Sequence, residues 1–176
     1  FTRIGKFSFP QLKPILASPL TTGYRNKLEY TFSDRRWLNS EDMALPAEER
    51  QTNGLGFHIP TLFDRVLDIT HCYHQPEPSN VIRLAIRDFT LQNGYSYYNP
   101  RTHLGFMRNL LIRNTLSGDL MVIIVFAYDA PQEINHLMTF VADSFPQITS
   151  LIYVINSKQN DVITDQEMLI WKGTPY

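Results

Sequence analysis

The chain has 176 residues, 43% of them hydrophobic, and a formal net charge of −1, which together are typical of one globular domain with a sizeable core. There is no recognisable signal peptide and no apolar run of about 18 residues, so composition argues against a membrane partner. A single cysteine excludes an internal disulfide and favours a reducing, cytoplasmic location.

The chain opens on Phe1 rather than Met, and we therefore expect a processed or excised piece of a longer protein. Residues 1–20 lack clear periodicity and contain prolines, which predicts a connector. The domain proper is expected over residues 21–176. It starts with a half-buried strand over 24–33, where apolar and polar residues alternate.

Residues 34–53 are polar and rich in Glu, and they predict a long insertion with at most one helical turn. Short strands are expected over 54–59 and 65–69. A helix follows, with Ser79 as its N-cap and Asn93-Gly94 as its stop. Its apolar residues recur at helical spacing, which would place Arg83 and Arg87 on its polar side.

The stretch from 105 to 128 organises the remainder of the chain. Two apolar runs flank a Ser117-Gly118 turn, which is a hairpin signal. The second run, 121–128, is almost entirely apolar and predicts a strand in the middle of a sheet. A second helix is expected from Pro131, followed by strands over 150–156 and 167–172. The fold class is therefore α+β: a mostly antiparallel sheet with two main helices packed on one face.

Charge is unevenly distributed. Residues 1–28 hold five basic residues and residues 89–118 hold three arginines, and neither stretch contains an acid. Such segments are candidates for contact with a polyanion. We predict RNA contacts at the basic and amide side chains of two strands, because arginine forks grip phosphate; these residues are Arg25, Asn26, Lys27, Arg108 and Arg113. The alternative is a solvated, salt-bridged sheet face.

The sequence carries few signals of catalysis or metal binding. The chain has no phosphate loop, GxGxxG fingerprint, serine elbow or HExxH motif, so no catalytic or cofactor-binding residue is assigned. The cluster His71-Cys72-Tyr73-His74 offers three metal-ligating side chains. A zinc site needs four ligands, and neighbouring residues of an extended segment point to opposite faces. We therefore expect no tight zinc site, and packing is the alternative role for Cys72.

Five segments, taken together and in order, resemble the S-adenosylmethionine-dependent RNA uracil-5-methyltransferase family, which makes 5-methyluridine in ribosomal and transfer RNA. They are YRNKLEYTFS (24–33), LGFH (55–58), VLDITHC (66–72), the asparagine of PSN (78–80) and GFMRNLLIR (105–113). The resemblance covers nearly the whole chain. It matches only the central region of the family, between an upstream Cys-rich and β-barrel region and a downstream methyltransferase domain.

The resemblance implies a central domain that positions structured RNA while the missing methyltransferase domain transfers the methyl group. Ribosomal RNA is the favoured substrate, although the sequence leaves the choice between ribosomal and transfer RNA open. The cofactors of the intact protein would be S-adenosylmethionine and a four-iron, four-sulfur cluster, with Cys72 as the fourth cluster ligand. The 176 residues alone would be inactive. The rival hypothesis is a free-standing RNA-binding or protein-interaction module without enzyme activity.

Overall fold

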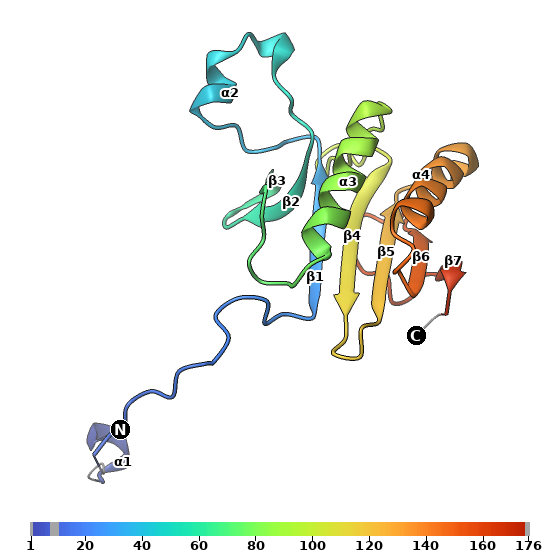
Figure 1. Ribbon diagram of the computed structural model, residues 1–176. Helices are drawn as coiled ribbons and strands as arrows, with labels where there is room; N and C mark the ends of the chain where they lie inside the picture. The colour runs from blue at the N-terminus through green and yellow to red at the C-terminus, as the bar shows by residue number, and fades with distance from the viewer. Residues whose placement is uncertain (1, 8–10, 175–176) are drawn as a thin grey trace.

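The computed structural model describes residues 2–7 and 11–174, with the side chain of residue 2 excepted. Strands and helices follow the predicted order (Figure 1). In chain order the elements are α1 (Thr2–Gly5), β1 (Lys27–Ser33), α2 (Ser40–Ala44), η1 (Ala47–Glu49), β2 (Gly54–Ile59), β3 (Leu62–Leu67), α3 (Ser79–Gln92), β4 (Met107–Asn114), β5 (Leu120–Phe126), α4 (Pro131–Ser144), β6 (Ser150–Ile155) and β7 (Leu169–Gly173). Among the described residues, no helix is both long and apolar enough to cross a membrane.

Seven strands form one sheet in the order β3-β2-β1-β4-β5-β6-β7. The prediction of an α+β fold is confirmed, but the prediction of a mostly antiparallel sheet needs correction, because the sheet is mixed. Strands β5 and β6 run parallel, with Val122 opposite Leu151. The physical reason is α4, which connects them as a crossover helix, and a crossover returns the chain in the same direction.

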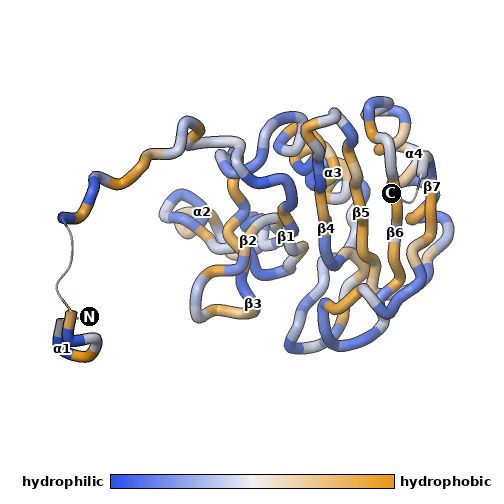
Figure 2. The backbone as a smooth tube through the Cα atoms, turned by 90° about the horizontal axis from the view of Figure 1, so that it is seen from below, coloured by the Kyte–Doolittle hydropathy of each residue, from blue (hydrophilic) through white to orange (hydrophobic). Residues whose placement is uncertain are grey.

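The helices α3 and α4 pack on one face of the sheet (Figure 1). The main core lies between them and the inward side chains of the central strands, including Tyr30, Leu110 and Ile124, which are fully buried. Figure 2 shows the apolar character of β5 and β6 along their length. Strand β5 lies between β4 and β6, so its predicted position within the sheet is confirmed.

The predicted helix ends are largely correct. Pro131 occupies the first turn of α4, and α3 ends at Gln92 with Asn93 as its C-cap, followed by Gly94 with φ of 69°. Ser79 is not the N-cap of α3, as predicted, but its first residue; the cap position belongs to Pro78. The Ser79 hydroxyl instead donates to the carbonyl of Pro76, and the carboxylate of Glu77 accepts from the backbone N–H of Asn80 at 3.1 Å.

Strand β2 changes partner along its length. Its first half pairs with β1 and its second half with β3, where Phe57 faces Leu67. Gly56 lies where the partner changes, and a Cβ at this position would lie 1.8 Å from the carbonyl oxygen of Leu67. The backbones can therefore approach this closely only at a glycine.

The predicted insertion over 34–53 extends from the sheet as a separate arm that contains α2 and η1 (Figure 1). The first turn of α2 is held by a capping box between Asn39 and Asp42, and Arg36 pairs with Asp42 at 2.6 Å. Residues 11–20, within the expected connector, form neither helix nor strand and are exposed. They run away from the sheet (Figure 1). The expected boundary at residue 20 stays a prediction.

Candidate RNA interface

The face of the sheet opposite α3 and α4, called here the open face, has its own smaller apolar cluster. Its buried members are Leu111, Ile123, Val125, Ile152 and Val154. The segment after β6 covers part of this cluster through Ile163. Two hollows flank the covered part, each of about 430 Å³, and Asp161 lines both of them. This face therefore combines a partly covered apolar floor with polar walls.

Four of the five predicted RNA-contact residues gather at one end of this sheet. Arg25 and Asn26 precede β1, and Lys27 lies directly opposite Arg113 of β4 in the strand register. All four are exposed. We call this group of Arg25, Asn26, Lys27 and Arg113 the basic end. Like charges directly opposite each other destabilise a strand pair unless an anion compensates them.

Nothing in the described part of the chain neutralises the basic end by an ion pair. No salt bridge among residues 2–7 and 11–174 involves Arg25, Lys27 or Arg113. Glu29 is an acid on the same face of β1; burial raises the pKa of its carboxyl above the ordinary value, although the nearby charge of Lys27 opposes this rise. The basic end thus presents its positive charge to solvent.

The backbone that carries Arg25 is fixed by the segment before α3. The N–H of Arg25 donates to the carbonyl of His74, and that of Gly23 donates to Tyr73, both at 2.8 Å. The Tyr24 hydroxyl and His74 Nδ1 are hydrogen-bonded at 2.7 Å. These contacts hold the start of β1 in place, so the position of Arg25 is defined before any ligand binds.

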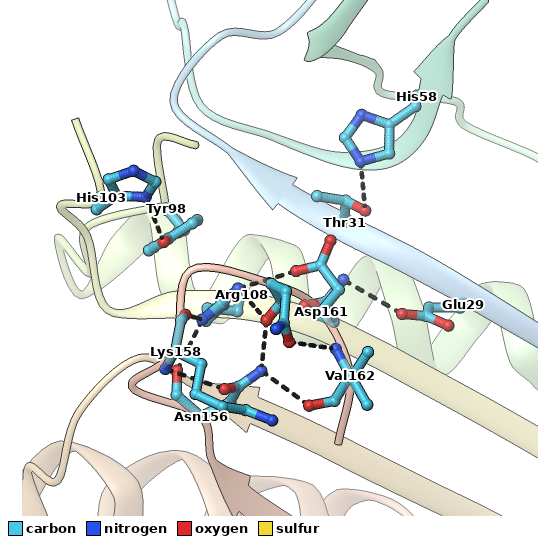
Figure 3. A network of polar contacts seen from close by, with 12 residues as sticks. Glu29, Thr31, His58, Tyr98, His103, Arg108, Asn156, Lys158, Asp161 and Val162 are labelled. Carbon is cyan, nitrogen blue, oxygen red and sulfur yellow. Dashed lines mark hydrogen bonds and ion pairs between the residues drawn. The ribbon is translucent and has the colours of Figure 1, made fainter. Parts of the chain in front are cut away.

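Arg108, the fifth predicted contact, is placed differently. Its side chain is 1% exposed and points into the loop of residues 156–161 (Figure 3). It donates to the carbonyl oxygens of Asn156, Lys158 and Asn160, and it pairs with the carboxylate of Asp161 at 2.9 Å. Its guanidinium carbon also lies 4.2 Å from the ring centroid of Tyr98. Arg108 therefore builds the open face and does not present a fork to an RNA phosphate.

Cys72 is 4% exposed and belongs to the main core cluster. Asn80 holds its backbone on both sides: Oδ1 accepts from the Cys72 N–H at 2.8 Å, and Nδ2 donates to its carbonyl at 3.1 Å. Cys72 also lines a shallow hollow together with Thr22 and Gly23, directly before β1. The thiol thus lies beneath the surface that the N-terminal segment crosses.

The two histidines that could join Cys72 in a zinc site have different surroundings. His71 is exposed and packs edge-on against Tyr73, whereas His74 is bonded to Tyr24. Within the described ranges, no group of three or more His, Cys, Asp or Glu side chains could hold a metal ion.

Sequence reasoning missed a buried polar cluster beside Cys72. Arg83 was expected on the polar side of α3 and is instead fully buried. The carboxylate of Asp68 lies 3.9 Å from Arg83 and 3.0 Å from Arg87, and the Leu55 carbonyl accepts from Arg83 at 3.3 Å. Burial lowers the pKa of Arg83. The signal available in the sequence was Asp68 itself, an acid directly before the Cys72 segment.

No family model matches the chain. An uncharacterized RNA methyltransferase of Bacteroides thetaiotaomicron is 47% identical over 174 residues, which are 97% of this chain and 38% of that protein. A second, of Porphyromonas gingivalis, is 45% identical over 185 residues, which are 99% of this chain and 38% of that protein. The chain is a homologue of RNA methyltransferases. The resemblance to RNA methyltransferases inferred from the sequence is thereby confirmed, and the chain spans 38% of the length of these two proteins.

A solved structure has the same fold as this RNA methyltransferase homologue. It is the Pyrococcus abyssi tRNA (uracil-54, C5)-methyltransferase in complex with S-adenosyl-L-homocysteine, with a TM-score of 0.59. The match covers 88% of this chain and 33% of that one, at 18% identity. At that identity the likeness establishes the fold of the domain.

Proposed function

We propose that the chain is the RNA-positioning domain of an RNA uracil-5-methyltransferase that uses S-adenosylmethionine. The observation that carries the proposal is the basic end, where Lys27 and Arg113 lie opposite each other in the strand register and neither forms an ion pair within the described residues. An RNA phosphate supplies the missing negative charge. The methyltransferase homologues and the shared fold support the enzyme over a free-standing binding module.

The division of labour follows from the residues present. Methyl transfer to uridine C5 by RNA uracil-5-methyltransferases requires a nucleophile and a cofactor loop. We assign neither to these 176 residues. We propose two partners for the chain. One is structured RNA, with ribosomal RNA favoured, and the other is the methyltransferase domain of the intact protein. The chain alone is expected to be inactive.

The proposal predicts a salt-dependent affinity for structured RNA. In the double variant Arg25→Glu/Arg113→Glu, the slope of log affinity against log salt should flatten by about 1.4–1.8, since each phosphate contact contributes roughly 0.7–0.9. Fluorescence anisotropy with a labelled RNA hairpin measures this slope. A control variant, Arg50→Glu/Lys172→Glu, makes the same change in net charge away from the basic end. Equal slopes in the two variants would refute the proposed surface.

We also propose that Cys72 is one ligand of a four-iron, four-sulfur cluster in the intact protein. Such clusters take four cysteine thiolates, and this chain offers one, placed where residues 22 and 23 cross it. The other three would come from the upstream segment. The structure therefore offers a single donor, beside the residues that lead into β1.

The cluster proposal predicts that the upstream-extended protein, purified without oxygen, is brown and contains about four iron atoms per chain. Cys72→Ser should lower the iron content and bleach the visible absorption, whereas His71→Ala should leave both unchanged. An iron-free extended wild-type protein would favour the packing role of Cys72.

A further inference from the structure

One of the two hollows on the open face has the composition of a binding site. It lies across β1, β2 and β4, and its walls are formed by residues before β4 and by the 156–161 loop. Its volume of about 430 Å³ falls within the roughly 300–1,000 Å³ that is usual for small-ligand sites. Figure 3 shows part of its polar lining: His58 is hydrogen-bonded to Thr31, and Asp161 lies next to Arg108.

An exposed aromatic ring forms one wall. The Phe63 residue is 60% exposed, and the guanidinium carbon of Arg101 lies 5.0 Å from its ring centroid. Arg101 is held there by Asp64, which accepts from its Nε at 2.6 Å and also pairs with Arg35. The hydrogen bond from Arg101 keeps the pKa of Asp64 below its ordinary value, so the carboxylate stays ionised. One carboxylate between two guanidiniums leaves a net positive charge beside the ring.

The floor supplies hydrogen-bonding groups of the kind that read base edges. The Thr31 hydroxyl and His58 Nε2 are hydrogen-bonded at 3.2 Å. The Asn109 amide lies on the same strand face as Thr31, directly opposite it in the register, and its Nδ2 reaches Glu29 only at 3.4 Å. An aromatic face combined with hydroxyl, imidazole and amide groups is how proteins bind single-stranded RNA bases.

We propose that this hollow binds one unstacked nucleobase of the RNA, stacked on Phe63 and contacted by Thr31, His58 and Asn109. The inference rests on the proposed function and deepens it by naming what the domain reads besides phosphate. Lys27 and Thr31 are four residues apart on β1, which corresponds to about 13 Å along the strand. One RNA strand can therefore contact the basic end and place a nearby base in the hollow. Arg108 holds the wall formed by the 156–161 loop.

The test compares a short single-stranded RNA with the same strand carrying abasic ribose at each position in turn. With the wild-type chain, one abasic position should weaken binding by about 5- to 150-fold, the usual range for one base stacked on an aromatic ring. In Phe63→Ala that penalty should disappear, because the stacking partner is gone. Val81→Ala, which removes an equally accessible apolar side chain from α3 (55% exposed), should behave as wild type.

A second measurement locates the base without relying on affinity. RNA with 4-thiouridine at the sensitive position should crosslink on irradiation to the peptide that contains Phe63, and mass spectrometry identifies that peptide. If the wild-type chain shows salt-dependent binding but no abasic position matters, the nucleobase site is wrong while the proposed function stands. If RNA binds to neither the wild type nor any variant at low salt, both fail.

Discussion

Replacing Arg108 with alanine is expected to lower the free energy of unfolding by about 3–5 kcal/mol. The side chain is 1% exposed and bonds to three backbone carbonyls and one carboxylate of the 156–161 loop. Hydrogen bonds from a charged donor contribute roughly 1.5–3 kcal/mol each. In the variant, the carbonyl of the buried residue Asn156 would lose the hydrogen bond that it accepts from Arg108. The loop would also lose its contact with Tyr98 through the guanidinium.

The matched control lies on the same strand. Arg113→Ala removes an exposed guanidinium with no ion-pair partner in the described chain, so the free energy of unfolding should change by no more than about 0.5 kcal/mol. Urea unfolding followed by tryptophan fluorescence, with Trp171 of β7 as a reporter within the sheet, measures both variants. Equal stability losses would show that Arg108 has no special structural role.

These two arginines show where prediction from sequence ends. Both interrupt an apolar strand, and both lie in a stretch without acids, so the sequence pattern predicts the same role for both. What separates them is a bulge in β4 near Arg108 and a loop about 50 residues further along the chain. Such long-range partners are invisible to periodicity, and the same limit explains the misplacement of Arg83, whose partner Asp68 lies outside α3.

The fold itself was largely predictable because its signals are local. Alternation located β1, an uninterrupted apolar run located β5, and Pro131 together with Asn93-Gly94 located two helix ends. The parallel pairing of β5 with β6 was missed, since it depends on the path of α4 over the sheet. The basic end was predictable from composition, but Phe63 was not, because an isolated exposed aromatic carries no pattern.

Under the proposed function, the basic end should control how the full-length protein holds its RNA. In the full-length protein, Arg25→Glu/Arg113→Glu is expected to raise the KM for structured RNA at least tenfold while kcat and the KM for S-adenosylmethionine stay close to wild type. Contacts with phosphates far from the reacting base stabilise the bound substrate and the transition state equally, so their loss appears in KM alone. The control variant Arg50→Glu/Lys172→Glu should match the wild-type enzyme.

The most direct test of the central claim is a kinetic assay of the full-length protein that identifies its product by nucleoside mass spectrometry. We expect 5-methyluridine as the product, and the double variant at the basic end to form the same nucleoside with a raised KM for RNA. A product other than 5-methyluridine would contradict the proposed reaction. An unchanged KM for RNA in the double variant would contradict the role of this domain in positioning the substrate.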